Sequence, residues 1–117
     1  MTEVDEEARA RKRRRVEMVS ELRHRGIRIQ KEWLSRKVTI EEVEQEHSVT
    51  DSRLGPEPVP FGFSNDSWVR VIGRREEGDE LWEFNSPPDT WANLCGRAGI
   101  CLVQDGWIVD AVITKMN

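Results

Sequence analysis

Histidines are the side chains in this sequence best suited to general acid-base chemistry, because they titrate near neutral pH. The two histidines, His24 and His47, both lie in the charged amino-terminal half of the chain. A serine or cysteine nucleophile in the carboxy-terminal half would therefore have to take its base from the other half. We interpret both histidines as solvent-facing helix residues, and we predict no histidine-dependent catalytic triad.

The cysteines and carboxylates do not form a recognisable catalytic or metal-binding pattern either. Cys95 and Cys101 lie six positions apart without a C-x-x-C motif or a neighbouring histidine, and we expect buried, reduced thiols. The spacing of Glu83, Asp89 and Asp110 selects no acid-base pair, and no glycine-rich phosphate loop is present. The sequence therefore predicts a non-enzymatic protein that holds no cofactor and no metal.

Basic residues gather in one block near the amino terminus. Residues 9–37 hold twelve Lys or Arg and three Glu, although the whole chain has a net charge of −4. A helix would present these cations all round, where several can reach phosphates and release counterions. Pairing with the acids at 3–7 and 41–46 would cancel much of this field. The candidate nucleic-acid-binding residues are Arg11, Lys12, Arg13, Arg14, Arg15, Arg25 and Arg28.

Aromatic residues supply the candidates for binding a protein partner. The chain has five Trp and no Tyr, and we assign Trp82 to the core. A sheet that packs a helix on one side leaves its other face exposed to solvent unless another segment or molecule covers that face. Either the amino-terminal helices or a second copy of the chain would provide that cover. The candidate partner-binding residues on this second face are Trp68, Ile72 and Trp107.

The amino-terminal half is predicted to be helical. Residues 4–25 contain good helix formers without Pro or Gly, and acids precede bases as the helix dipole favours. Residues 27–37 fit either a strand or a helix, and we favour a helix. Thr39-Ile-Glu-Glu42 has the form of a capping box, which predicts a helix over 40–47. The alternating prolines within 51–66 then indicate an extended linker.

The carboxy-terminal half is predicted to form two hairpins around a helix. Residues 67–73 and 80–84 form the first hairpin, and residues 100–104 and 107–114 flank Asp105-Gly106, a strong hairpin signal. Between them, Ser86, Pro87 and Pro88 begin a helix that ends at Gly96. The resulting registers place Val71 opposite Phe84, Leu102 opposite Val109, and Cys101 opposite Asp110.

These elements predict an α+β fold: amino-terminal charged helices followed by a small ββαββ domain whose antiparallel sheet packs on one helix. The domain plan is a charged helical arm (1–50), a Pro-containing linker (51–66) and the ββαββ domain (67–117). Apolar residues are denser after position 60, so we place the core in residues 61–117 and expect that segment to fold alone.

The function that these features favour is a small interaction or regulatory protein. It would bind a protein partner or itself through the sheet face, and the alternative is a nucleic-acid-associated protein that uses the basic helix 9–31. No apolar run approaches the roughly 18 residues needed to span a membrane, and the acidic start is unlike a secretory signal. We therefore expect a cytoplasmic protein with no membrane association.

Overall fold

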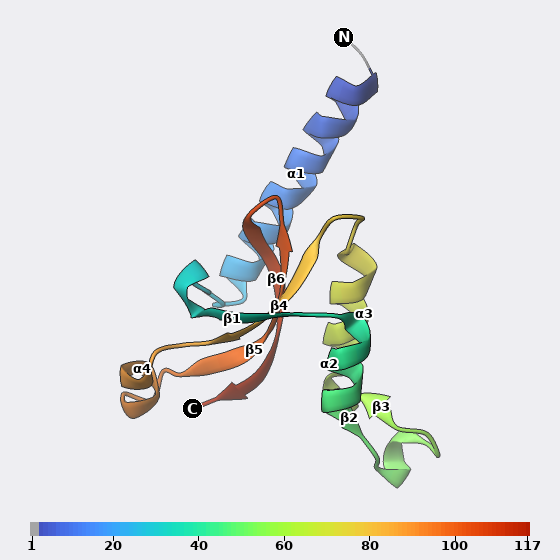
Figure 1. Cartoon of the computed structure of the whole chain (residues 1–117), viewed down its shortest axis with the longest axis vertical. Coiled ribbons are helices and arrows are strands. Elements are labelled where there is room, and N and C mark those ends of the chain that lie inside the picture. Colours follow the sequence, from blue (N-terminus) through green and yellow to red (C-terminus); the bar gives the residue numbers. More distant parts are fainter. Residues whose placement is uncertain (1–2) are drawn as a thin grey trace.

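The computed structural model describes residues 3–117 and shows an α+β fold with a four-stranded antiparallel sheet, as predicted (Figure 1). The sheet has the spatial order β1-β4-β5-β6, formed by Leu34–Val38, Glu80–Asn85, Arg97–Gln104 and Trp107–Met116. The helices are α1 (Glu3–His24), α2 (Ile40–His47), α3 (Asn65–Arg74) and α4 (Pro88–Ala92). A small ribbon pairs β2 (Ser48–Val49) with β3 (Val59–Pro60), and single 3-10 turns occur at η1 (Lys31–Trp33), η2 (Ser52–Leu54) and η3 (Gly62–Ser64).

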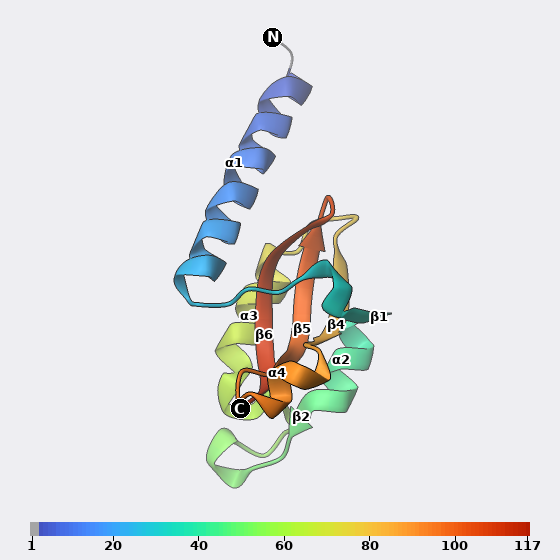
Figure 2. The same ribbon diagram turned by 90° about the vertical axis from the view of Figure 1, so that its left-hand side faces the viewer.

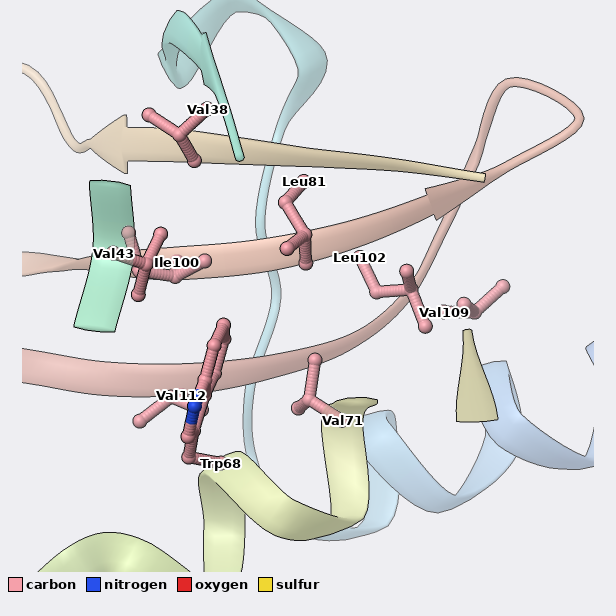
Figure 3. Packing of buried hydrophobic residues seen from close by; sticks show 9 residues of the cluster. All are labelled: Val38, Val43, Trp68, Val71, Leu81, Ile100, Leu102, Val109 and Val112. Atoms are coloured by element: carbon pink, nitrogen blue, oxygen red, sulfur yellow. The ribbon is translucent and has the colours of Figure 1, made fainter. Parts of the chain in front are cut away.

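One face of the sheet is covered by α2 and α3. Successive residues of a strand point to opposite faces, so Ile100 and Leu102 of β5 share this side. They pack with Val43 from α2 and with Trp68 and Val71 from α3, all nearly inaccessible to solvent (Figure 3). Burial of large apolar side chains on this scale is the main stabilising contribution to a domain of this size.

The opposite face is covered by the end of α1 and the segment that follows it. Cys101 and Val103 of β5 point to this side and pack with Leu22 of α1. The apolar side chains of Ile27 and Ile29 add to the same cluster. The sheet therefore has buried side chains on both faces, and it is the middle layer of the molecule (Figure 2).

Helix α1 lies along β6, the edge strand, and its amino-terminal half projects beyond the sheet (Figures 1 and 2). Met18 and Val19 touch the cluster on one face, whereas Leu22 belongs to the cluster on the other. The projecting half is largely exposed, including Val4 at 72%. Packing fixes the carboxy-terminal half of α1, and helix propensity together with the charge order supports the rest.

Three local predictions are confirmed by the structure. Helix α1 ends before Gly26, which has a positive φ of 77°. The capping box is present, since the Thr39 hydroxyl accepts from the Glu42 N–H and the Glu42 carboxylate accepts from the Thr39 N–H, both at 3.1 Å. Asp105 and Gly106 adopt φ values of 50° and 82°, which suits the tight turn that joins β5 to β6.

The predicted strand 67–73 is wrong, because these residues lie in α3. Trp68 and Val71 are buried at helical spacing, whereas Val69, which lies between them in the sequence, is 57% exposed. The residues before Trp68 are Asn65, Asp66 and Ser67, types favoured where a helix begins. The short run Trp-Val-Arg-Val-Ile fits both periods, and packing against the sheet decides for the helix.

The partner of β4 comes instead from a segment for which we favoured a helix. Residues 34–38 form β1, which pairs with β4 through Leu34 opposite Phe84 and Val38 opposite Leu81. The predicted pairing of Val71 with Phe84 is therefore wrong. A strand with three exposed central residues has little periodicity of its own, so its pairing with β4 defines it.

Three further expectations need correction. A register shift in the second hairpin places Leu102 opposite Asp110 and Cys101 opposite Ala111, one position away from the prediction. The core is not confined to residues 61–117, because Leu22, Val38 and Val43 are buried in it. The helix expected to reach Gly96 ends at Ala92.

Candidate functional site

A buried carboxylate on the edge strand ties α1 and α3 to the sheet. Asp110 of β6 is fully buried, and it accepts hydrogen bonds from Arg70 and Arg74 of α3 at 3.0 Å and from Arg25, just after α1, at 3.1 Å. Its own strand contributes the Ala111 N–H at 2.8 Å. Burial favours the neutral acid, but these donors outweigh it and hold the pKa of Asp110 below its ordinary value.

A second cluster holds α1 near the turns that precede β4 and β6. Buried Asp79 accepts from the Arg11 guanidinium at 3.2 Å and from the Gln104 amide at 3.0 Å. The exposed carboxylate of Asp105, in the hairpin turn, lies 3.1 Å from Arg11 and 3.2 Å from Arg15. The middle of α1 is thus fixed by ion pairs with two loops.

These clusters divide the predicted nucleic-acid-binding residues into two groups. Arg11, Arg14, Arg15 and Arg25 contact acids at positions 76, 79, 105 and 110, so they hold the fold together. These four pair with acids outside 3–7 and 41–46, whereas Arg36, which also belongs to the basic block, pairs as expected with Glu42 at 3.4 Å and Glu46 at 2.9 Å. Lys12, Arg13 and Arg28 have exposed side chains without an ion pair in the described part of the chain.

A basic groove runs between α1 and the β5–β6 hairpin. It encloses about 630 Å³ and brings together four Lys or Arg side chains and a histidine. Its lining, as far as residues 3–117 form it, contains no Asp or Glu. A second hollow of about 230 Å³ continues it beneath the end of α1 and adds Lys31. The basic groove is lined by Lys12, Arg15, Val16, Val19, Ser20, Arg23, His24, Arg28 and Trp107.

Trp107 is the aromatic member of the basic groove. Its residue is 52% exposed at the start of β6, and it lines both hollows. The Arg15 guanidinium carbon lies 5.8 Å from the centre of the ring, a cation–π arrangement that helps to hold the indole in place. The hairpin turn therefore presents a large aromatic surface among cations.

The three predicted partner-binding residues are not brought together. Trp68 is 1% exposed in the core, and its indole N–H donates to Glu44 at 3.0 Å. Ile72 packs partly buried on α3. The expectation that both share an exposed sheet face with Trp107 is therefore wrong, and Trp107 belongs to the basic groove instead.

Sequence reasoning did not select Arg23 and His24 as binding residues. A signal for Arg23 was present, because Lys12, Val16 and Arg23 recur at the spacing of one helix face. No local sequence pattern predicts that Trp107 lies near this helix face, because the two segments are more than 80 residues apart in the chain. Only the docking of α1 on β6 joins them.

The remaining reactive side chains do not gather. His24 is exposed and lines the basic groove, whereas His47 is partly buried and stacks on Phe61 with ring centres 4.9 Å apart. The prediction that both histidines face solvent is therefore wrong for His47. Both cysteines are free thiols; Cys101 is buried as expected, but Cys95 is exposed. Burial raises the pKa of Cys101 to about 12.

No group of three or more His, Cys, Asp or Glu within residues 3–117 is placed to hold a metal ion. The same residues include no helix that is both long and apolar enough to cross a bilayer. Comparison of the chain with protein-family models, with curated proteins and with solved structures gave no match.

Proposed function

We propose that this protein is a non-enzymatic, cytoplasmic nucleic-acid-binding module whose contact surface is the basic groove. The observation that carries the proposal is the composition of that groove. The chain has 22 acidic and 18 basic residues, yet the groove lining gathers Lys12, Arg15, Arg23 and Arg28 without a carboxylate. A local field of this kind attracts a polyanion even when the net charge is negative.

The arrangement of the ion pairs supports the same function. Arg11 and Arg25 anchor α1 at two points, through Asp79 and Asp110, so Lys12 and Arg23 project from a fixed helix, and Arg28 follows shortly after the second anchor. Lys12, Arg23 and Arg28 have no acidic partner within residues 3–117. Because the backbone that carries these cations is already fixed, only their side chains have to be ordered when they meet phosphates.

Binding of a protein through the sheet face has less support. Both faces carry buried clusters, because Leu22 covers one side and Trp68 covers the other. Val16 and Trp107 both line the basic groove, and the other large apolar side chains exposed within residues 3–117 lie on separate elements or loops: Val4, Val49, Phe63, Val69, Leu94 and Met116. Single exposed apolar residues are normal for a protein surface.

The test is the binding of a labelled oligonucleotide of about 20 nucleotides, single-stranded or duplex, followed by fluorescence anisotropy across a salt series. Lys12, Arg23 and Arg28, the three groove cations without an acidic partner within residues 3–117, predict a log–log salt slope of about −2, so binding weakens roughly 20-fold between about 50 mM and 200 mM salt. The double variant Arg23→Gln/Arg28→Gln should lower the slope by about two-thirds and weaken binding of every sequence equally.

A matched control removes two exposed cations elsewhere. Lys37 lies on β1, at the far edge of the sheet, and Arg53 lies in η2; their side chains are 60% and 74% exposed. Lys37→Gln/Arg53→Gln changes the net charge by the same amount and should leave the salt slope unchanged. Equal losses in the two double variants, or no binding at low salt, would refute the proposed site.

A further inference from the structure

We infer that the basic groove takes single-stranded nucleic acid and that Trp107 stacks on an unpaired base. This inference rests on the proposed function, and it adds the class of nucleic acid and the residue that distinguishes it. Aromatic rings stack on bases of any sequence, and bases become accessible in this way only when they are not held in a duplex.

Trp107 occupies a position from which its indole can stack on a base. The residue lies where the two hollows meet, since it lines both, together with Val19, Arg23 and Arg28. Its backbone is fixed directly after the hairpin turn, where it pairs with Gln104 of β5. The hairpin and Arg15 thus hold the half-exposed indole in one place.

Basic side chains continue along the two hollows on both sides of the indole. Lys12 and Arg15 line the larger hollow, Arg23 and Arg28 line both, and Lys31 lines the smaller hollow. A phosphate backbone following the two hollows would meet a cation along its whole path, with a base directed at Trp107. Proteins that bind single strands combine a basic path with stacking aromatics in this way.

The size of the basic groove favours a single strand over a duplex. The hollow beside Trp107 encloses about 630 Å³ and is open to solvent along α1. Pockets of this size accommodate a group as large as a nucleotide, but they are far too small to enclose a double helix. A duplex can therefore touch the outer cations without placing a base on the indole, whereas a flexible strand can do both.

The experiment compares four ligands with the whole protein: oligothymidylate, an abasic strand of equal length, a duplex, and heparin, which has charge but no bases. We expect oligothymidylate to bind about ten-fold more tightly than the abasic strand, which has the same phosphates. Trp107→Ala should remove that difference, and it should weaken binding of the abasic strand, the duplex and heparin less than binding of oligothymidylate. Trp107→Phe should retain part of the difference.

The chain offers a matched control for the aromatic substitution. Phe63 is 65% exposed and lies under Arg53, whose guanidinium carbon is 5.0 Å from the ring centre, so it repeats the Trp107–Arg15 arrangement away from the groove. Phe63→Ala should leave the preference for oligothymidylate intact. The wild-type comparison of thymidylate and abasic strands requires no variant, so the test holds even if Trp107→Ala fails to fold.

The outcomes separate the inference from the proposed function. Equal binding of oligothymidylate and the abasic strand, tighter binding of duplex than of either strand, or an equal effect of Trp107→Ala and Phe63→Ala would overturn the role of Trp107 while leaving nucleic-acid binding in place. Failure of all four ligands to bind at low salt would overturn both.

Discussion

Replacing Asp110 by Asn should destabilise the protein more than any substitution of an exposed charge. The change keeps the shape of the side chain but removes the charge that faces Arg25, Arg70 and Arg74, each within 3.0–3.1 Å. Loss of one member of a buried ion pair costs about 3–5 kcal/mol, because its partners remain without compensation.

The structure places the expected loss near the lower end of that range. The arginine side chains are 28–32% exposed, so they recover some hydration when the carboxylate is lost. The Asn carbonyl can still accept from the Ala111 N–H, which now bonds Asp110 at 2.8 Å. We expect the free energy of unfolding to fall by about 3 kcal/mol, a large part of the total stability of a small domain.

Urea denaturation followed by tryptophan fluorescence measures this loss as a lower midpoint at an unchanged slope. The matched control is Asp105→Asn, the same chemical change at a carboxylate that also meets two arginines but is 52% exposed. Asn tolerates the positive φ of that turn, so the control should cost less than about 1 kcal/mol. Equal losses at Asp110 and Asp105 would refute the structural importance of the buried network.

The same variant tests the sign of the charge effect. The pKa of Asp110 is lower in the folded protein than its ordinary value of 3.8, so the unfolded chain binds more protons as the pH falls through this range. The stabilisation by Asp110 is therefore complete above about pH 4 and is lost as the pH falls toward the folded-state pKa. A gap between wild type and Asp110→Asn that is as wide at pH 3 as at pH 7 would contradict a charge-based origin.

Three further substitutions or reactions test the fold. Gly99→Ala should lower the free energy of unfolding by more than about 3 kcal/mol, because the new Cβ would lie 2.0 Å from the Val112 carbonyl oxygen; a near-normal urea midpoint would contradict this close approach. Thr39→Ala should cost about 1 kcal/mol through loss of the capping box, and Thr39→Ser, the control, should cost less. An aromatic disulfide reagent should modify Cys95 rapidly and Cys101 only after unfolding, since burial raises the pKa of Cys101 to about 12; rapid modification of both native thiols would contradict the burial.

Local chemistry alone determined several elements of this protein. The uninterrupted helix formers and ordered charges of 4–25, the capping box at 39–42, and Asp105-Gly106 each act within a few residues, and each produced the element that was predicted. Their signals hold because capping, dipole and turn interactions depend on neighbours in the chain. The basic block was visible for the same reason, since charge density is a local property.

Tertiary contacts decided the rest. Residues 67–73 alternate like a strand, but they form a helix because Trp68 and Val71 are buried against the sheet. Residues 34–38 have little pattern of their own, and they form a strand because they pair with the backbone of β4. Only ion pairing between distant segments decides which basic residues anchor α1 and which stay free. The basic groove arises in the same way: Trp107 reaches Arg23 because packing along β6 brings together segments whose contact no local pattern encodes.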